Sequence, residues 1–577
     1  MRGEGDTVAM RITARAQQLR RKNEDGVGRN GEPDALGIES ATARCGKTVA
    51  ANSGGVDTAN RVTGPRRMIR SHALSVYRWS PGIVTAGPLA ALFAAAYLLV
   101  APMGRDLSAQ IAHAELAQQY WPALLDLRWY GGFDPLGYSV LSPPVMVLLG
   151  VRATTALAYL ASVLLFAALL KRTRVTRPAA GAITAAVCLT GNLVVSRTTF
   201  ALGLAVALGA LLTLAFGRPR ITVMLAVLAA LSSPVAGLFL GIAGGALFLS
   251  GQRRSGVTLA IAGMVPTIAV GLAFGNGGYQ TFGLKQALSG LAVCLAVAGL
   301  CWRQRIVRWG ALLSAGMVAA AYLVPTPVGT TATRLPELFA APIIVAVATI
   351  PLIGIVAATA AVGLVLPPVS VTEVLDRGDP ALSTTFYAPL LDQLKVRGVA
   401  GPIEVVPTLR RGEAAVVAPV VPIARGWSRQ VDTGNSPIFY DGTLNADRYR
   451  GWLDDNAVSY VALTTGPYDW AATDEAALVR RGLPYLNPVW SDRTWTLYAV
   501  MNPHPVLSAP GEVIARNAVS LTMSLPQPGE YTLRVRWSPY LSLSNGCVKP
   551  AHGGWTTVVV QNPGTATLEG SLAPRHC

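Results

Sequence analysis

Ten apolar stretches recur between residues 79 and 366, and they constrain the fold of this chain more than any other feature. They cover roughly 82–103, 145–170, 179–195, 199–217, 220–232, 234–251, 256–275, 286–302, 308–324 and 338–366. A helix needs about 20 residues to cross a bilayer, and several stretches are shorter or broken by proline, as in LSSPVAG around Pro234. Short, broken apolar helices are typical of a bundle that lines a cavity. The sequence therefore predicts an α-helical polytopic membrane protein with about 10–11 spans.

The charged residues divide the chain into three parts of different character. Lys and Arg outnumber Asp and Glu by 14 to 8 in residues 1–78 and by 17 to 5 in residues 79–366, whereas residues 367–577 carry 17 basic and 18 acidic residues. A content of 51% hydrophobic and 14% charged residues is that of a membrane protein. Because the basic residues of the middle part lie between apolar stretches, we expect no nucleic-acid partner.

The basic connectors predict how the chain is oriented in the membrane. They are KRTRVTR (171–177), GRPR (217–220), GQRR (251–254) and RQRIVR (303–308). These connectors fall at every second junction, and loops rich in Lys and Arg stay in the cytoplasm. The alternate junctions then face outward, and residues 105–144 form the first outer loop. If the stretch 338–366 is two short spans broken near Pro351, residues 367–577 lie outside a plasma membrane that the chain crosses many times.

Residues 1–78 have no apolar period and are rich in Arg, Gly, Asp, Glu and Thr, so they cannot bury enough surface to offset chain entropy. We expect a disordered cytoplasmic tail, and translation from Met68 is an alternative to translation from Met1. The stretch 82–103 is too long for a cleaved signal peptide and is interpreted as a signal anchor of the transmembrane domain, residues 79–366.

The C-terminal part has a soluble composition and two successive patterns. Residues 367–502 mix helix-like segments with strand-like ones such as SYVAL and TWTLYAV, which predicts an extracytoplasmic α/β region. Residues 503–577 contain short alternating strands between Pro and Gly turns, as in GEYTLRVRWSPYLSL, which predicts a β-sandwich module. Cys547 and Cys577 are the two cysteines of this part, and they form either one disulfide in an oxidising compartment or two free thiols.

The outer loop begins with side chains that can support acid–base chemistry. Apolar residues at i, i+4 and i+7 from Leu107 predict a helix at the membrane surface, and Asp106 and His113 share another face of that helix. A carboxylate beside an imidazole can act as a general base on a hydroxyl group. Glu115 is a further candidate catalytic residue. Gln110 lies on the same face as Asp106 and His113, and the alternative is that these three are solvated loop side chains.

Three cations depart from the pattern of basic cytoplasmic loops. Arg197, Lys285 and Arg334 lie at the outer ends of apolar stretches, where a charged group needs a partner because its desolvation is costly. A phosphate headgroup is one such partner, and arginine suits it well. Glu337 is an alternative partner for Arg334, and ordinary lipid phosphates are another. The candidate substrate-binding residues are therefore Arg197, Lys285, Arg334 and Glu337. No C-x-x-C pair exists and the five histidines are scattered, so we expect no metal site and no cofactor.

The chain also resembles a known class of enzymes. The Asp-Leu pair at 106–107 after the first apolar stretch, the long interfacial loop, paired spans such as LSSPVAGLFL and the C-terminal domain look like membrane glycosyltransferases of the GT-C class. The segments RLPELFAAP, ARGWSRQVD and YRGWLDDNAVSYVAL are similar to uncharacterised actinobacterial multipass proteins, over about residues 80–577. The paired acidic motif of GT-C enzymes is absent, because a lone Asp106 is followed only by Glu115, nine residues on.

The resemblance implies a cell-envelope enzyme that transfers a sugar from a polyprenyl-phosphate donor to an envelope glycan or lipid acceptor. Asp106 would deprotonate the acceptor hydroxyl, while Arg334 or Lys285 would neutralise the leaving phosphate. Aromatic residues of the sandwich, such as Trp555 and Tyr540, are either stacking surfaces for the acceptor or core residues. Two other functions stay open: a multipass transporter (permease), which also needs broken spans, and a non-catalytic envelope-assembly protein.

Overall fold

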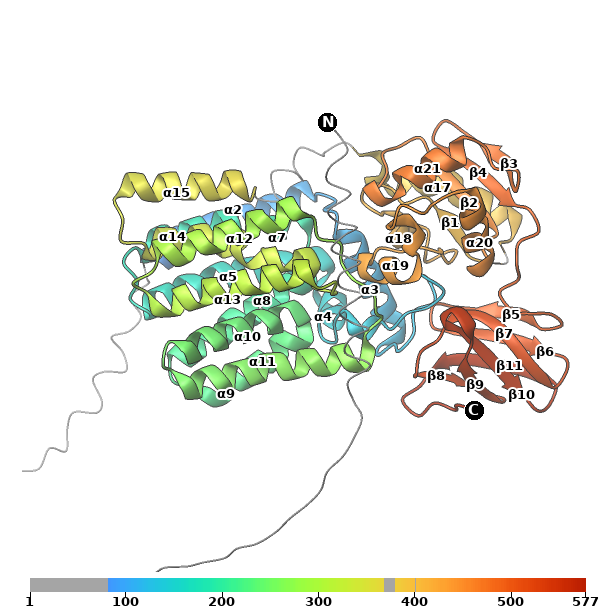
Figure 1. Ribbon diagram of the computed structural model, residues 1–577, viewed down its shortest axis with the longest axis horizontal. Helices are drawn as coiled ribbons and strands as arrows, with labels where there is room; N and C mark the ends of the chain where they lie inside the picture. Colours follow the sequence, from blue (N-terminus) through green and yellow to red (C-terminus); the bar gives the residue numbers. More distant parts are fainter. Residues whose placement is uncertain (1–80, 368–378, 400) are drawn as a thin grey trace, which may run out of the picture. The chain divides into compact units, whose positions relative to one another are not determined.

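A computed structural model describes residues 81–367, 379–399 and 401–577 of the chain (Figure 1). The predicted tail at 1–78 and the alternative start at Met68 lie outside the described residues. Up to Val365 the described chain is helical, and beyond Pro380 it contains sheets. We refer to residues 81–365 as the helical part, to 379–502 as the α/β part and to 503–577 as the sandwich.

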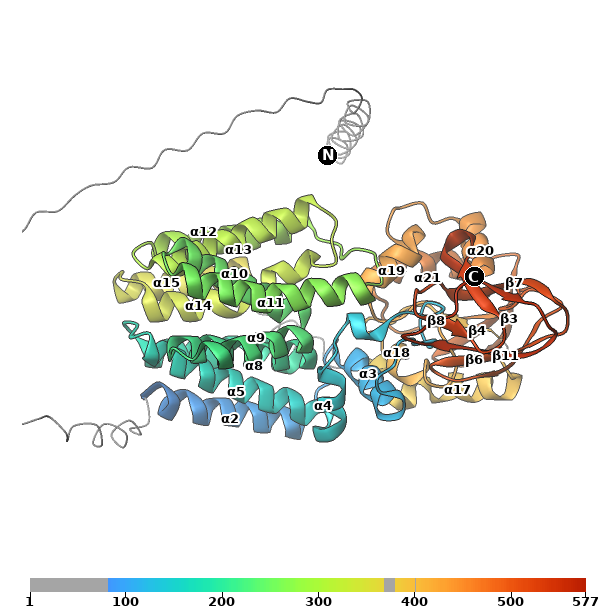
Figure 2. The same ribbon diagram turned by 90° about the horizontal axis from the view of Figure 1, so that it is seen from below.

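The helices of the helical part lie side by side (Figure 2). They are α2 (Pro81–Val100), α3 (Leu107–Tyr120), α4 (Ser142–Leu149), α5 (Val151–Arg172), α6 (Pro178–Cys188), α7 (Thr190–Val195), α8 (Thr198–Ala215), α9 (Pro219–Ser232), α10 (Pro234–Leu249), α11 (Arg253–Phe274), α12 (Leu284–Leu300), α13 (Arg305–Leu323), α14 (Arg334–Val347) and α15 (Leu352–Val365). The short 3-10 helices η1 (Pro135–Gly137) and η2 (Gly329–Thr333) precede α4 and α14.

Six helical segments among the described residues are long and apolar enough to cross a membrane. They are Val151–Arg172, Pro178–Val195, Thr198–Ala215, Arg253–Phe274, Arg305–Leu323 and Gly329–Val347. Five shorter apolar helices accompany them. Large apolar side chains such as Leu148, Leu272 and Ile353 remain more than four-fifths exposed, as expected where lipid rather than water surrounds a helix. These helices suggest a membrane-embedded protein, in agreement with the sequence.

Proline marks several helix boundaries of the helical part. Helices α6, α9 and α10 each begin with a proline: Pro178, Pro219 and Pro234. At the first position of a helix a backbone N–H group would have no partner within the helix, so proline loses no hydrogen bond there. The last apolar stretch is broken near Pro351, which is one of the possibilities that its length left open: α14 ends at Val347 and α15 begins at Leu352. The stretch therefore forms two short helices rather than one long one.

The α/β part contains one four-stranded sheet in the order β1-β2-β4-β3. Its strands are β1 (Ile403–Val405), β2 (Tyr460–Thr464), β3 (Leu486–Ser491) and β4 (Trp495–Val500). Strands β1 and β2 are parallel, and the chain between them forms α18 (Glu413–Val416), α19 (Arg429–Asn435), η4 (Pro437–Phe439) and α20 (Ala446–Asp455). The remaining helices are η3 (Pro380–Leu382), α17 (Thr384–Arg397), η5 (Trp470–Ala472) and α21 (Thr473–Arg480).

The sandwich consists of two antiparallel sheets that share one apolar core. Its strands are β5 (Glu512–Arg516), β6 (Ser520–Leu525), β7 (Gly529–Arg536), β8 (Leu541–Leu543), β9 (Cys547–Pro550), β10 (Trp555–Val560) and β11 (Gly564–Gly570), with η6 (His552–Gly554) before β10. The strand orders are β7-β10-β9 and β5-β6-β11-β8. Burial alternates along β6, which is the pattern of a strand with one face in a core. Core residues such as Met523 and Val558 come from opposite sheets.

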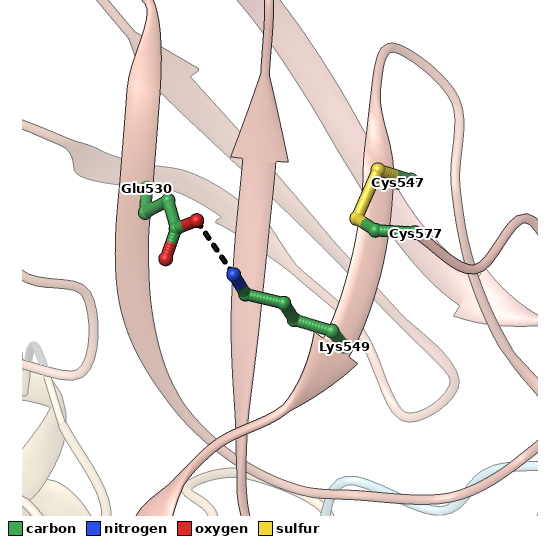
Figure 3. The surroundings of a disulfide bond; sticks show 4 residues. All are labelled: Glu530, Cys547, Lys549 and Cys577. Atoms are coloured by element: carbon green, nitrogen blue, oxygen red, sulfur yellow. Dashed lines mark hydrogen bonds and ion pairs between the residues drawn. A yellow bond between two sulfur atoms is a disulfide. The ribbon is translucent and has the colours of Figure 1, made fainter.

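A disulfide joins the start of β9 to the end of the chain (Figure 3). It links Cys547 to Cys577, whose Cα atoms are 5.2 Å apart. Across the strand β10, Lys549 Nζ of β9 lies 2.6 Å from Glu530 Oε1 of β7. The covalent bond therefore fixes the last residues of the chain to the edge strand β9.

The predicted outer loop, residues 105–144, is built into both C-terminal parts. Leu127 N–H donates a hydrogen bond to the carbonyl of Ala518 at 2.7 Å, and Leu127 belongs to the sandwich core. The Trp129 side chain is fully buried and donates from Nε1 to the carbonyl of Ala414 at 3.3 Å. Helix α3 packs on α18. The loop is thus an integral part of the C-terminal cores rather than a solvated connection.

Candidate functional site

A cavity of about 930 Å³ lies where the helical part meets the α/β part. Six arginines and three carboxylates line it: Arg105, Arg197, Arg334, Arg410, Arg411 and Arg429, with Asp106, Glu337 and Asp469. These nine side chains carry a formal excess of three positive charges, so the cavity attracts anions. Uncharged polar groups such as Gln280 and Thr331 complete the wall.

Asp106 is held at the cavity by the segment that joins α2 to α3. Its backbone N–H donates to the carbonyl oxygen of Val195 at 3.1 Å. Gly104 permits this approach, because a Cβ atom there would collide with the backbone of Val194 and Val195. The close contact brings the end of α7 beside Asp106, immediately before α3 begins.

Arg197 lies in the break between α7 and α8 and faces two carboxylates. Its Nε is 3.4 Å from Asp106 Oδ2, and its Nη1 is 3.9 Å from Glu337 Oε2. Ser196 before it takes a left-handed conformation that turns the chain between the two helices. Within the described residues, the buried Nε and Nη1 of Arg197 have no hydrogen-bond partner. A guanidinium with unused N–H groups can bind a further anion.

Arg334 and Glu337 come from the first turn of α14, where a negative charge is favoured by the helix dipole. The guanidinium carbon of Arg334 lies 5.3 Å from the centre of the Phe200 ring, in a cation–π contact. Among the described residues, the Arg334 side chain makes no ion pair or hydrogen bond, although the Asp106 and Glu337 carboxylates lie near enough to act on its charge. Its charge is therefore available to a ligand in the cavity.

Tyr138 of the outer loop contributes a hydroxyl group to the same wall. Gln110 Nε2 donates to the Tyr138 oxygen at 2.7 Å, and Thr199 Oγ1 donates to Gln110 Oε1 at 2.6 Å. Burial raises the pKa of Tyr138 to about 12, and the nearby Asp106 carboxylate also raises it. The phenol therefore keeps its proton at neutral pH and can donate it to a ligand.

The other predicted catalytic residues lie away from the cavity wall. His113 is buried, and its ring stacks on Tyr138 with 4.7 Å between ring centres. Burial lowers the pKa of His113 to about 4, so the imidazole is neutral at pH 7. Glu115 is on the half-exposed side of α3, where burial raises its pKa and Arg128 partly offsets this rise. The structure does not bring either residue together with Asp106 in the cavity.

Two further expectations differ from the structure. The helix expected at the membrane surface, α3, has polar as well as apolar residues buried, among them Ser108 and Gln110, because the α/β part covers it. Lys285 is exposed at the start of α12 and is not among the residues lining the cavity, although its neighbour Gln286 is. Arg197, Arg334 and Glu337 are the candidate substrate-binding residues that do meet there.

The α/β part supplies a second wall that the sequence did not indicate. Arg429 Nη1 and Nη2 donate to Asp469 Oδ1 and Oδ2 at 2.8 and 2.6 Å, which makes the pair bidentate. Arg411 Nη2 lies 3.3 Å from Asp432 Oδ2 and 3.6 Å from Asp469 Oδ1. Burial acts to raise the pKa of Asp469, but Arg411 and Arg429 outweigh it and hold this pKa below its usual value. Arg411 and Arg429 are thus both paired with carboxylates of this wall.

Two tryptophans of the α/β part also line the cavity. Trp427 Nε1 donates to the carbonyl oxygen of Arg105 at 3.0 Å and thereby ties the α/β part to the outer loop. Trp470 is 59% exposed. Trp427 and Arg429 both belong to the segment ARGWSRQVD.

Among the described residues, no group of three or more His, Cys, Asp and Glu side chains is arranged to hold a metal ion. Comparison with protein-family models, with curated proteins and with solved structures finds no match to this chain. The geometry of the cavity is therefore the basis for any functional assignment.

Proposed function

We propose that this protein is a cell-envelope glycosyltransferase that transfers a sugar from a polyprenyl-phosphate donor to an envelope glycan or lipid acceptor. The observation that supports it is the meeting in one cavity of a carboxylate, Asp106, with two guanidinium groups: Arg197 beside it, and Arg334, whose side chain has no ion-pair partner among the described residues. An anionic leaving group and a nucleophile that must lose a proton need this combination.

In the proposed reaction the acceptor oxygen attacks the anomeric carbon of the donor sugar. A new bond forms between that carbon and the acceptor oxygen, and the bond to the phosphate oxygen breaks. The acceptor proton goes to Asp106, and polyprenyl phosphate leaves with the electron pair. Arg334 and Arg197 neutralise the charge on the leaving phosphate, and the Tyr138 hydroxyl can donate a hydrogen bond to it.

The proposed reaction takes place at the outer face of the plasma membrane. The described residues contain six long and five shorter apolar helices. In the proposed topology all eleven cross the membrane, and this odd number puts the N-terminal tail and the C-terminal parts on opposite sides. The basic connectors favour a cytoplasmic tail. Because the loop 105–144 packs into the α/β part and the sandwich, these three segments share one compartment. The disulfide favours an oxidising compartment.

The test of the proposed function is the glycolipid and glycan profile of a strain that lacks the protein. We expect the deletion to remove one envelope glycan or glycolipid and to leave its polyprenyl-phosphate sugar precursor accumulated. Unchanged glycans together with altered solute uptake would instead favour the permease. Unchanged glycans with unchanged uptake would favour a non-catalytic role in envelope assembly.

A further inference from the structure

The exposure of the Trp470 side chain is not explained by packing within the protein. Trp470 is the first residue of η5 and lines the cavity, yet 59% of its surface is exposed. An indole left in water forgoes a large part of the stabilisation that its burial would bring. An exposed tryptophan in the wall of a polar cavity is therefore expected to have an occupant.

The ring of Trp470 is held in a fixed orientation. The guanidinium carbon of Arg429 lies 4.9 Å from the ring centre, and the Tyr440 ring meets it edge-on at 5.9 Å. Asp469, the residue before it, accepts a hydrogen bond from Ala471 N–H at 2.9 Å and holds Arg429 at both carboxylate oxygens. A preorganised aromatic surface binds a ligand at low entropic cost.

Arg429, whose guanidinium lies over the Trp470 ring, is already paired with a carboxylate. Both oxygens of Asp469 accept hydrogen bonds from it, and Arg411 is likewise paired with Asp432 and Asp469. The surface formed by Trp470, Arg429 and Asp469 therefore favours an uncharged, hydrogen-bonding ligand over an anion. A neutral sugar ring has an apolar face for the indole and hydroxyl groups for the Arg429–Asp469 pair.

We propose that Trp470, together with the Arg429–Asp469 pair, forms the binding site for a neutral sugar ring of the acceptor. This assignment rests on the proposed function. The proposed reaction has two substrates, a donor and an acceptor, and the assignment states the chemical class of the acceptor. The aromatic residues of the sandwich are less suited to this role. Trp555 is 4% exposed beneath Arg536, and Tyr540 stacks on Phe274.

The test is saccharide binding to the full-length protein in lipid nanodiscs, measured by saturation-transfer difference NMR. The probes are neutral gluco-, manno-, galacto- and arabino-oligosaccharides, with oligosaccharides of uronic acids as charged counterparts. Trp470→Ala should weaken binding of a neutral probe about tenfold, and Trp470→Phe should restore most of it. Trp302→Ala is the matched control, because Trp302 is 58% exposed and also carries an arginine on its ring, Arg303.

Binding lost in Trp470→Ala and kept in Trp302→Ala supports the site. It is overturned if no neutral probe binds the wild type, if Trp470→Ala binds as the wild type does, or if the uronic-acid probes bind more tightly than the neutral ones. The sugar site is also overturned if Trp470→Ala alters the interaction of the protein with the nanodisc lipid but leaves saccharide binding unchanged. If an Asp106→Asn variant binds the probes normally and also supports normal glycan synthesis, the proposed reaction is contradicted. The proposed sugar-binding site is not.

Discussion

Arg197 Nε lies 3.4 Å from Asp106 Oδ2, although Asp106 directly precedes α3, Arg197 directly precedes α8, and the two are far apart in the sequence. The contact depends on Gly104 before α3 and on the left-handed turn at Ser196 before α8. It places the carboxylate and the guanidinium in one cavity. In the proposed reaction this carboxylate is the base, and the cavity around it binds the phosphate of the donor.

Replacing Arg334 should weaken donor binding. Arg334→Ala removes a cavity cation that has no ion-pair partner among the described residues, so retention of a polyprenyl phosphate should fall about tenfold. Native mass spectrometry with polyprenyl phosphate and with the uncharged polyprenol measures this difference. Lys285→Ala is the control, because Lys285 is exposed and is not among the cavity-lining residues. Equal loss of the alcohol and the phosphate would contradict a phosphate site at Arg334.

Adding one methyl group at Gly104 should disturb the site. In Gly104→Ala the new Cβ meets backbone atoms that cannot rotate away, so we expect a loss of about 1–3 kcal/mol in the free energy of unfolding. Gly299→Ala is the matched control, because nothing lies within 4 Å of a Cβ there and alanine favours a helix. Thermal unfolding of the two variants in detergent gives the comparison. A Gly104→Ala protein as stable as Gly299→Ala would disprove the close approach.

Acidification should destabilise the protein through His113. The unfolded chain binds a proton at this residue below about pH 6.5, whereas the folded protein does so only below about pH 4. Between these values the unfolded state binds more protons, so the free energy of unfolding falls as the pH falls, by about 3 kcal/mol in total. His113→Phe keeps an aromatic ring in the stack and should remove this part of the pH dependence. The exposed His552→Phe should not. Identical pH profiles of His113→Phe and the wild type would contradict the burial of a neutral imidazole.

Reporter fusions after residue 370 should show that the C-terminal parts are extracytoplasmic. We expect an active phosphatase fusion and a dark fluorescent-protein fusion, because the proposed topology, in which the six long and five shorter apolar helices all cross, leads from a cytoplasmic tail to the outside. Mass spectrometry of unreduced peptides should recover Cys547 joined to Cys577 in protein isolated from the envelope. A fluorescent, phosphatase-inactive fusion, or two free thiols, would reject the outer placement.

The sequence predicted the cavity wall formed by the helical part, because the charged residues of this wall occupy equivalent positions along the chain. Asp106, Arg197, Arg334 and Glu337 all lie at the ends of apolar stretches, and the alternation of basic connectors assigns these ends to the same side. Helices that run side by side then bring such ends together. The break of the last apolar stretch is also a local feature, because Pro351 lies within the stretch and α15 begins directly after it.

The second wall could not be predicted, since it depends on contacts between parts that are remote in the sequence. Arg429, Asp469 and Trp470 reach the cavity only because the α/β part packs against the outer loop. His113 shares a polar face of its predicted helix with Asp106, but in the fold the rings of Trp129 and Phe133 lie against it. Periodicity describes one helix at a time and carries no information on what covers it.

The most direct measurement is the glycan profile of a deletion strain complemented with Asp106→Asn. This change keeps the size and hydrogen bonding of the side chain but removes the base, so the missing glycan should not return although the protein reaches the membrane in normal amounts. Glu115→Gln, a change of the same kind on α3 outside the cavity lining, should restore the glycan fully. Full complementation by Asp106→Asn would contradict the glycosyltransferase mechanism.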